Sequence, residues 1–243
     1  MTHLLLCLWG QWYAGSIGML QTFQAVGDGQ VSTQQRLSWG TGVAVGRTFG
    51  DGRWGMTAEV LSAFVQIGSR IKSPEELYEN RTRISAAEAV LLAEHYWQLG
   101  SGWEFLVEGG AVLNIPYRLE YFAQHNSRQG ESFLFMEGRK YWEMTPNGNR
   151  FGTLRESPYP KSEVSVLTGV GLEKRITDHW SLVLEARLEY SPHPMELPVQ
   201  RGELTELAGW HLPTRPPHLL AESLQLSVFY FFGHTPHHKE SML

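Results

Sequence analysis

The sequence predicts an all-β protein, an eight-stranded antiparallel up-and-down transmembrane β-barrel with short turns at one end and long loops at the other. Three observations lead to this fold class. Apolar and polar residues alternate with a period of two along several segments. No run approaches the roughly 18 apolar residues that a membrane-spanning helix needs. The connections between the segments are alternately long and tight, which is typical of such barrels.

The clearest alternation lies in residues 180–190, which follow a tight polar turn at 177–179 and form a predicted hairpin with 162–176. One face of this segment is apolar and consists of Leu182, Leu184, Ala186, Leu188 and Tyr190. The other face is mostly polar and consists of Ser181, Val183, Glu185, Arg187 and Glu189. A membrane barrel turns such an apolar face to lipid and the charges to its lumen. The alternative is a soluble lipocalin-like barrel, whose aliphatic faces would point inward around a ligand.

Eight strands follow from the same pattern along the chain, and residues 81–99 also admit a helical interpretation. The predicted strands cover residues 12–23, 37–49, 53–69, 81–99, 103–121, 162–176, 180–190 and 221–232. Tight turns are predicted at 50–52, 100–102 and 177–179, where glycine or short polar residues allow sharp reversals. The longest loops are predicted at about 122–161, with a small hairpin at 133–144, and at about 191–220.

The rest of the composition excludes several kinds of protein. The net charge of −5 and the absence of a basic cluster argue against binding of nucleic acid. The single cysteine, Cys7, excludes an internal disulfide and a cysteine-rich metal site, and we expect neither a metal nor a cofactor. Residues 1–11 are interpreted as a truncated signal or a lead-in to the barrel at 12–233, and residues 234–243 as a flexible periplasmic tail.

Three segments resemble a known family. They are ISAAEAVLLAEHYWQLGSGWEFLVEGGAVLNIPY at 84–117, SVLTGVGLEKRITDHWSLVLEARLEYS at 165–191 with its paired Gly169 and Gly171, and LQLSVFYFFG at 224–233. They are similar to the small outer-membrane β-barrel proteins of Bacteroidetes-type bacteria, the porin-family or PorT-like group, whose barrel is shaped like the OmpA membrane domain. The resemblance implies location in a bacterial outer membrane, contact with outer-membrane lipid, and tight turns on the periplasmic side.

The inward-facing positions of the predicted strands are rich in carboxylates. The expected polar network of the lumen consists of Glu59, Glu88, Glu104, Glu108, Glu173, Arg175, Glu185 and Arg187, with Glu94, Glu163, Glu189 and Arg118 on the same predicted faces. An eight-stranded barrel is just wide enough to be filled by side chains. A packed polar interior with Arg–Glu pairs is therefore the favoured interpretation, and a proton or cation path is the alternative.

The third long loop carries aromatic side chains beside cations, a combination typical of binding hot spots. The candidates for binding are Phe133, Phe135, Arg139, Tyr141 and Trp142. The alternative is that this hairpin only extends the strands and packs on itself.

We therefore expect a non-enzymatic outer-membrane anchor or binding scaffold that uses its outer loops, as a subunit of an envelope complex or through another envelope protein. The first alternative is a narrow pore or an accessory in transport or secretion. The second is a lipid-modifying hydrolase that uses His125 and Ser127, although these residues lack a placed acidic partner and we expect no catalytic residues.

Overall fold

The computed structural model describes residues 10–26, 32–34, 36–50, 52–72, 77–127, 130–153, 162–192 and 218–232. Its regular elements are β-strands, and their neighbours are antiparallel, which confirms the all-β prediction. Residues 81–99 are strand and not helix. The strands are β1 (Trp12–Val26), β2 (Ser32–Gln34), β3 (Ser38–Phe49), β4 (Trp54–Lys72), β5 (Leu77–Gly100), β6 (Trp103–Ser127), β7 (Gly130–Glu137), β8 (Lys140–Thr145), β9 (Gly148–Thr153), β10 (Glu163–Arg175), β11 (Trp180–Tyr190) and β12 (His218–Phe232).

Among the described residues, no helix is long and apolar enough to cross a membrane.

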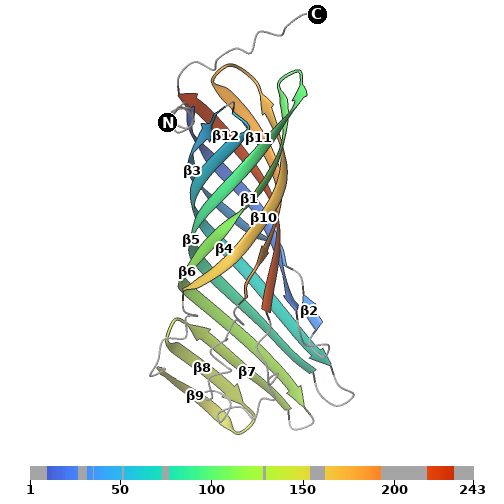
Figure 1. Cartoon of the computed structure of the whole chain (residues 1–243). Helices are drawn as coiled ribbons and strands as arrows, with labels where there is room; N and C mark the ends of the chain where they lie inside the picture. The colour runs from blue at the N-terminus through green and yellow to red at the C-terminus, as the bar shows by residue number, and fades with distance from the viewer. Residues whose placement is uncertain are drawn as a thin grey trace, which may run out of the picture.

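Eight of the strands pair into a ring, in the order β10, β11, β12, β1, β3, β4, β5, β6. The ring closes because β6 also pairs with β10, in a continuous register from Trp103↔Lys174 to Asn114↔Glu163. Figure 1 shows these strands as a barrel of tilted strands, with the connection between β10 and β11 at one end. A closed ladder leaves no unpaired edge in the barrel wall. The predicted turns at 50–52, 100–102 and 177–179 connect neighbouring strands of this ring.

The strands of the ring turn a largely apolar face outward. On β11, Leu182, Leu184 and Leu188 are exposed, whereas Glu185 and Arg187 are buried inside, as the alternation predicts. The outward-facing residues of the first half of β6 and of β3, β10 and β12 are likewise mostly apolar, while other apolar side chains of these strands, such as Leu106 and Phe229, point into the barrel. The lipocalin-like alternative required the aliphatic faces of β6 and β11 to point inward and their charged faces to lie in water, and it is wrong for these two strands because Glu108, Glu185 and Arg187 are buried inside.

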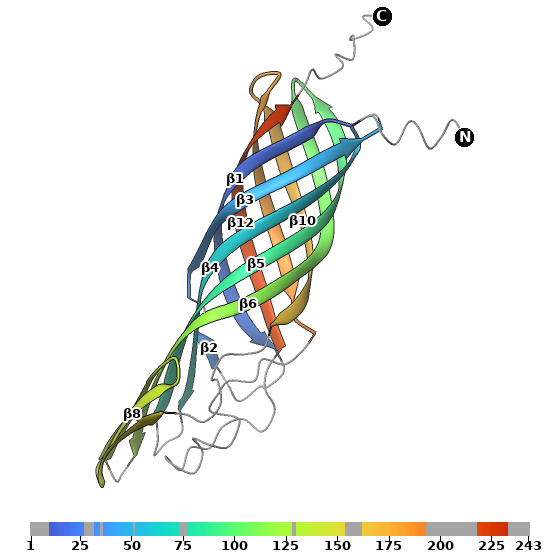
Figure 2. The same ribbon diagram turned by 90° about the vertical axis from the view of Figure 1, so that its left-hand side faces the viewer.

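An open sheet continues from one end of the barrel, as Figure 2 shows. We call it the extension; it consists of β7, β8 and β9 with the ends of β4, β5 and β6 that run beyond the ring. Asn114 is the last residue of β6 that pairs with β10, and Glu120 is the first that pairs with β7. The segment at 122–161, predicted as a loop around one hairpin, thus contains the end of β6 and three further strands. Residues 154–161 and most of the loop predicted at 191–220 lie outside the described residues.

A β-bulge in β6 separates the barrel from the extension. Ser85 of β5 pairs with Arg118 and Ala86 pairs with Pro116, so Tyr117 is the additional residue on β6. A bulge shifts the alternation of faces by one residue. Even-numbered residues of β6 therefore point inward before Tyr117, and odd-numbered residues do so after it. The prediction that Arg118 shares the inner face with Glu108 is wrong for this reason, and Arg118 is exposed.

Candidate functional site

The middle of the barrel interior holds an ionic network around Arg187 of β11. Arg187 donates two hydrogen bonds to Glu59 at 2.8 and 2.9 Å and two to Glu108 at 2.6 and 3.1 Å. It also donates to Glu185 at 3.3 Å and to the side-chain oxygen of Gln225 at 2.8 Å. The Nε, Nη1 and Nη2 atoms of the guanidinium are thus all engaged, with bidentate contacts to two carboxylates.

The network joins opposite walls of the barrel. In the ring order, β4, which carries Glu59, is four positions from β11 in either direction. Gln225 of β12 completes the network because its amide nitrogen donates to Glu185 at 3.0 Å and to Ser227 at 3.2 Å. Gln225 was not among the predicted lumen residues, although the run LQLSVFYFF places this glutamine and Ser227 on one face of an alternating strand.

Two glycines make room for the network. A Cβ atom at Gly169 would lie 2.3 Å from Glu108 Oε1, and one at Gly171 would lie 2.8 Å from Glu185 Cγ. Both glycines lie on the inner face of β10, where a larger side chain would displace Glu108 or Glu185. The paired glycines of the predicted hairpin therefore have a packing function in the lumen.

The other predicted lumen residues are divided between two places. Glu88 is buried on the inner face of β5 in the middle of the barrel. Glu104, Glu173 and Arg175 lie together nearer the tight-turn end, where Glu173 pairs with Glu104 in the strand register and Arg175 Nε is 3.8 Å from Glu173. The guanidinium of Arg175 also lies 4.6 Å from the ring centroid of Phe231.

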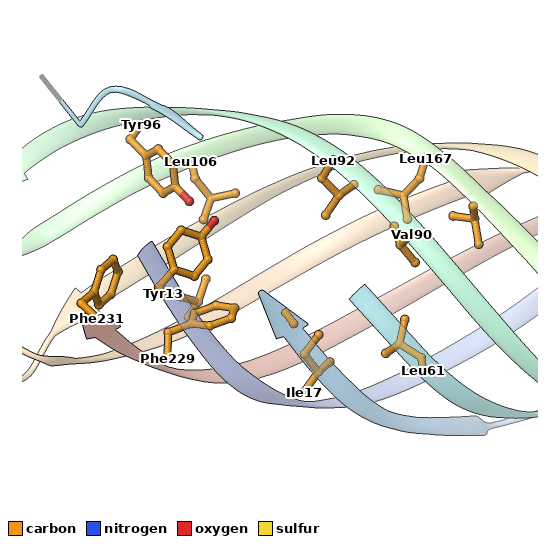
Figure 3. Packing of buried hydrophobic residues seen from close by; sticks show 13 residues of the cluster. Tyr13, Ile17, Leu61, Val90, Leu92, Tyr96, Leu106, Leu167, Phe229 and Phe231 are labelled. Atoms are coloured by element: carbon orange, nitrogen blue, oxygen red, sulfur yellow. The ribbon is translucent and has the colours of Figure 1, made fainter. Parts of the chain in front are cut away.

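Three hydroxyl groups surround the carboxylate of Glu94, a cluster that was not predicted from the sequence. This carboxylate accepts hydrogen bonds from Tyr13 at 2.8 Å, Thr57 at 2.6 Å and Tyr96 at 2.8 Å. Apolar side chains pack around Tyr13 and Tyr96, two of these donors, as Figure 3 shows for Phe229 and Leu106. Three hydroxyl donors satisfy a buried carboxylate that has no cation in this group.

The interior is thus filled by apolar clusters and hydrogen-bonded polar groups. Among the described residues, no group of three or more His, Cys, Asp or Glu side chains is arranged to hold a metal ion. His125, one of the two residues of the hydrolase alternative, lies in the part of β6 that belongs to the extension. The side chain of the other, Ser127, lies outside the described residues.

The outer face of the extension carries the second candidate site, a row of aromatic side chains. Phe122, Phe135, Trp142 and Phe151 lie directly opposite one another on β6, β7, β8 and β9. We call these four residues the aromatic row. The rings of Phe135 and Trp142 are 5.6 Å apart, and these residues are 39% and 44% exposed. Phe151, at the end of the row, is 83% exposed.

The binding candidates predicted from the sequence fall in three places. Phe135 and Trp142 belong to the aromatic row, and Phe133 lies beside it with its ring 6.3 Å from that of Phe122. Tyr141 lies on the opposite face, where it packs against the apolar cluster of Leu134 and Met136. Arg139 lies in the turn between β7 and β8. Phe122 and Phe151 were missed because both lie outside the predicted hairpin at 133–144.

A row of charged residues separates the aromatic row from the apolar wall of the barrel. Arg118 is paired with Glu120 at 2.8 Å and with Glu137 at 3.3 Å, and Arg83 is paired with Glu120 at 3.5 Å. Lys140 lies opposite Glu137 in the next strand. The aromatic row is therefore not a continuation of the apolar barrel wall.

No protein-family model matches the chain, and none of the curated proteins does. Solved structures do resemble it at low identity. Neisserial surface protein A is 10% identical with a TM-score of 0.45, covering 91% of this chain and 97% of its own. OprG from Pseudomonas aeruginosa is 10% identical with a TM-score of 0.40, covering 93% and 97%. CarO from Acinetobacter baumannii is 13% identical with a TM-score of 0.39, covering 90% and 97%. Similarity at this level is too low to support a function.

Replacing Arg187 with methionine tests the central network. Arg187→Met keeps a similar volume but leaves Glu59, Glu108 and Glu185 without their cation, and breaking a buried ion pair costs about 3–5 kcal/mol. We expect a large fall in the urea midpoint of unfolding in lipid vesicles. Arg175→Met, at a half-buried position, is the matched control and should have a smaller effect. Adding Glu108→Gln to Arg187→Met should restore part of the lost stability, because it removes one unpaired carboxylate. An Arg187→Met variant as stable as the wild type would contradict a structural role for the network.

Glu143 of β8 offers a test of pH dependence in the extension. It is 1% exposed, and neither carboxylate oxygen has a hydrogen-bond partner among the described residues. Burial raises the pKa of Glu143, while the nearby Arg150 opposes the shift. A carboxyl with a raised pKa in the folded state destabilises the fold as pH rises above its ordinary value of about 4.3.

We therefore expect hydrogen exchange of the β8 amides, corrected for intrinsic rates, to become faster as pH rises from about 4.3 toward neutral. The reason is that the buried carboxyl of Glu143 ionises more easily when this part of the extension opens than when it is closed. Glu143→Gln should remove this dependence and slow exchange at neutral pH. The same pH dependence in both proteins would show that Glu143 is not its source.

Proposed function

We propose that the protein is a bacterial outer-membrane β-barrel that anchors a binding platform, the extension, outside the bilayer. The observation that carries the proposal is the orientation of the faces: the outer face of the closed ring is apolar, and the charged side chains of Glu59, Glu108, Glu185 and Arg187 are buried inside. A ring of this kind in water would expose a continuous apolar wall, which soluble monomers avoid. In a bilayer the same wall contacts acyl chains, and the closed ladder satisfies its backbone groups.

The dimensions of the wall support insertion. On β3, Trp39 and Phe49 face outward at opposite ends of the strand, with Val43 and Val45 between them. The one charged residue of this face, Arg47, lies over the rings of Trp12 and Phe49 near the rim. About ten strand residues rise about 33 Å, and a tilt of about 40° leaves about 25 Å along the barrel axis. Aromatic girdles at both rims of an apolar band of this height are typical of outer-membrane barrels. The narrower assignment to the PorT-like group of Bacteroidetes-type bacteria is part of this proposal and rests on the sequence resemblance.

The aromatic row supports the platform role. It presents exposed Phe135, Trp142 and Phe151 beyond the charged residues that border the barrel wall. An apolar patch outside the lipid-facing band and rimmed by charges is characteristic of a surface that another molecule covers. The proposed role is binding without catalysis, with an envelope protein as the partner.

The first test is insertion. Leu226 faces outward in the middle of β12, between Leu184 and Gly18 of its neighbours. Leu226→Arg should reduce stability in lipid vesicles by about 2–4 kcal/mol, whereas Phe232→Arg near the rim should cost at most about 1 kcal/mol. Urea unfolding in vesicles measures both. The wild-type protein should also fractionate with outer membranes, and its gel mobility should shift on boiling. Insertion would be refuted if the two arginine variants were equally stable and the wild-type protein were soluble.

The second test concerns conduction. Because the Arg187 network and the apolar residues around it fill the lumen, purified protein in a planar bilayer should give no steady open-pore current. Glu59→Ala combined with Arg187→Ala removes both sides of the central contact and serves as a positive control for an opened lumen. A stable current from the wild type would favour the narrow-pore alternative over a purely anchoring barrel.

A further inference from the structure

The last strand of the extension, β9, is a sheet edge. Its described neighbour is β8, and it stands at the end of the strand order. Alternate residues of an antiparallel strand direct both backbone groups to the same side. Half of the residues of β9 therefore direct their N–H and C=O groups away from β8, where a further strand could bind them.

Edges of this kind are usually protected, and β9 has neither proline, lysine nor bulge; its one charged residue is Arg150. Its sequence, GNRFGT, contains no proline and no lysine. Its register with β8 runs without a bulge from Lys140↔Thr153 to Thr145↔Gly148. Proteins block exposed edges with prolines, lysines, bulges or inward-pointing charges because an open edge pairs with other chains. Among the described residues β9 pairs only with β8, so its other edge is able to accept a strand.

The side chains of β9 indicate what kind of strand fits. Phe151 projects from the outer face beside Trp142 and is the most exposed member of the aromatic row. A residue opposite it on an added strand would lie about 5 Å away and extend the row. The neighbouring residue, Arg150, is exposed on the other face, where an acidic residue of the added strand would complement its charge. The pattern that fits is an apolar residue alternating with an acidic one.

A second copy of this chain does not fit the edge in one membrane. The strands of the extension run on from the barrel wall, as Figure 2 shows. Antiparallel pairing of β9 with β9 of another copy requires a two-fold axis through the sheet, and this axis would turn the second barrel over. Two barrels inserted in the same direction cannot satisfy it.

We propose that β9 is the docking edge for an extended segment of a second protein, in which apolar and acidic residues alternate, and which binds by adding a strand to the extension. This inference rests on the proposed function because it names the partner of the same platform. The segment contributes backbone hydrogen bonds to β9, an apolar side chain beside Phe151 and a carboxylate beside Arg150. Strand addition of this kind derives affinity from the main chain and specificity from alternate side chains.

The test uses the full-length folded protein in detergent and a capped, fluorescent eight-residue peptide in which valine alternates with glutamate. Two further versions carry N-methyl groups on either the odd or the even residues. A strand bound at one edge uses the N–H groups of one set only. We expect one N-methylated peptide to bind about tenfold more weakly or worse, while the other binds within about twofold of the parent, because only one set of hydrogen bonds is lost.

Variants of the protein complete the test. Phe151→Ala should weaken the parent peptide about fivefold through loss of apolar contact area. Arg150→Ala should remove the preference for the valine–glutamate peptide over a valine–lysine peptide. Lys174→Ala, at the tight-turn end, is the matched control and should bind as the wild type does.

Each outcome separates the two proposals. If both N-methylated peptides bind alike while Phe135→Ala and Trp142→Ala weaken binding, strand addition at β9 is wrong and the platform role stands. If neither the glutamate nor the lysine peptide binds the wild type, strand addition is also wrong. If a peptide binds and is unaffected by Phe135→Ala, Trp142→Ala and Phe151→Ala, both strand addition and the platform role of the aromatic row are overturned.

Discussion

The pairing of β6 with β10 is the contact on which the rest of the structure depends. It joins the two ends of the strand order and converts a sheet into a ring. Once the ring is closed, each strand has one face inside and one outside, and the alternation along the sequence decides which residues go where. The apolar wall, the charged lumen and the position of the extension all follow from that closure.

Closure of the ring also buries several carboxylates, and Arg187 is the cation that pairs with them. The carboxylates of Glu59, Glu108 and Glu185 are brought from three strands into a space from which water is largely excluded. One guanidinium with bidentate contacts to two of them, together with Gln225, gives these groups partners across the barrel. Such a network contributes little net stability compared with apolar packing, but its partial loss is costly, so it holds the opposite walls at a fixed separation.

The sequence was sufficient for the parts of the fold that depend on local pattern. The two faces of residues 180–190 and the tight turn at 177–179 could be assigned because a strand has a period of two and a hairpin has few turn types. The inward direction of Glu59, Glu108, Glu185 and Arg187 followed from the same rule.

Contacts between distant strands could not be predicted in this way. That Arg187 reaches Glu59 depends on the number and order of strands in the ring, which no local pattern contains. The bulge at Tyr117 is a single extra residue, and an unbroken period of two therefore placed Arg118 on the wrong face. The aromatic row was only partly recognised, because Phe151 has as neighbours Arg150 and Gly152 and shows no alternation of its own.

The strand β5 runs from Leu77 to Gly100 without interruption, through both the extension and the barrel. There is consequently no linker between the extension and the barrel along this strand. A pulling force on a bound partner would be carried along a covalent backbone and shared across the ladders with β4 and β6, in shear rather than by opening one bond after another. Under the proposed function, a partner bound to the extension would be held at a fixed distance from the bilayer and in a fixed orientation, because the continuous strand does not act as a flexible linker.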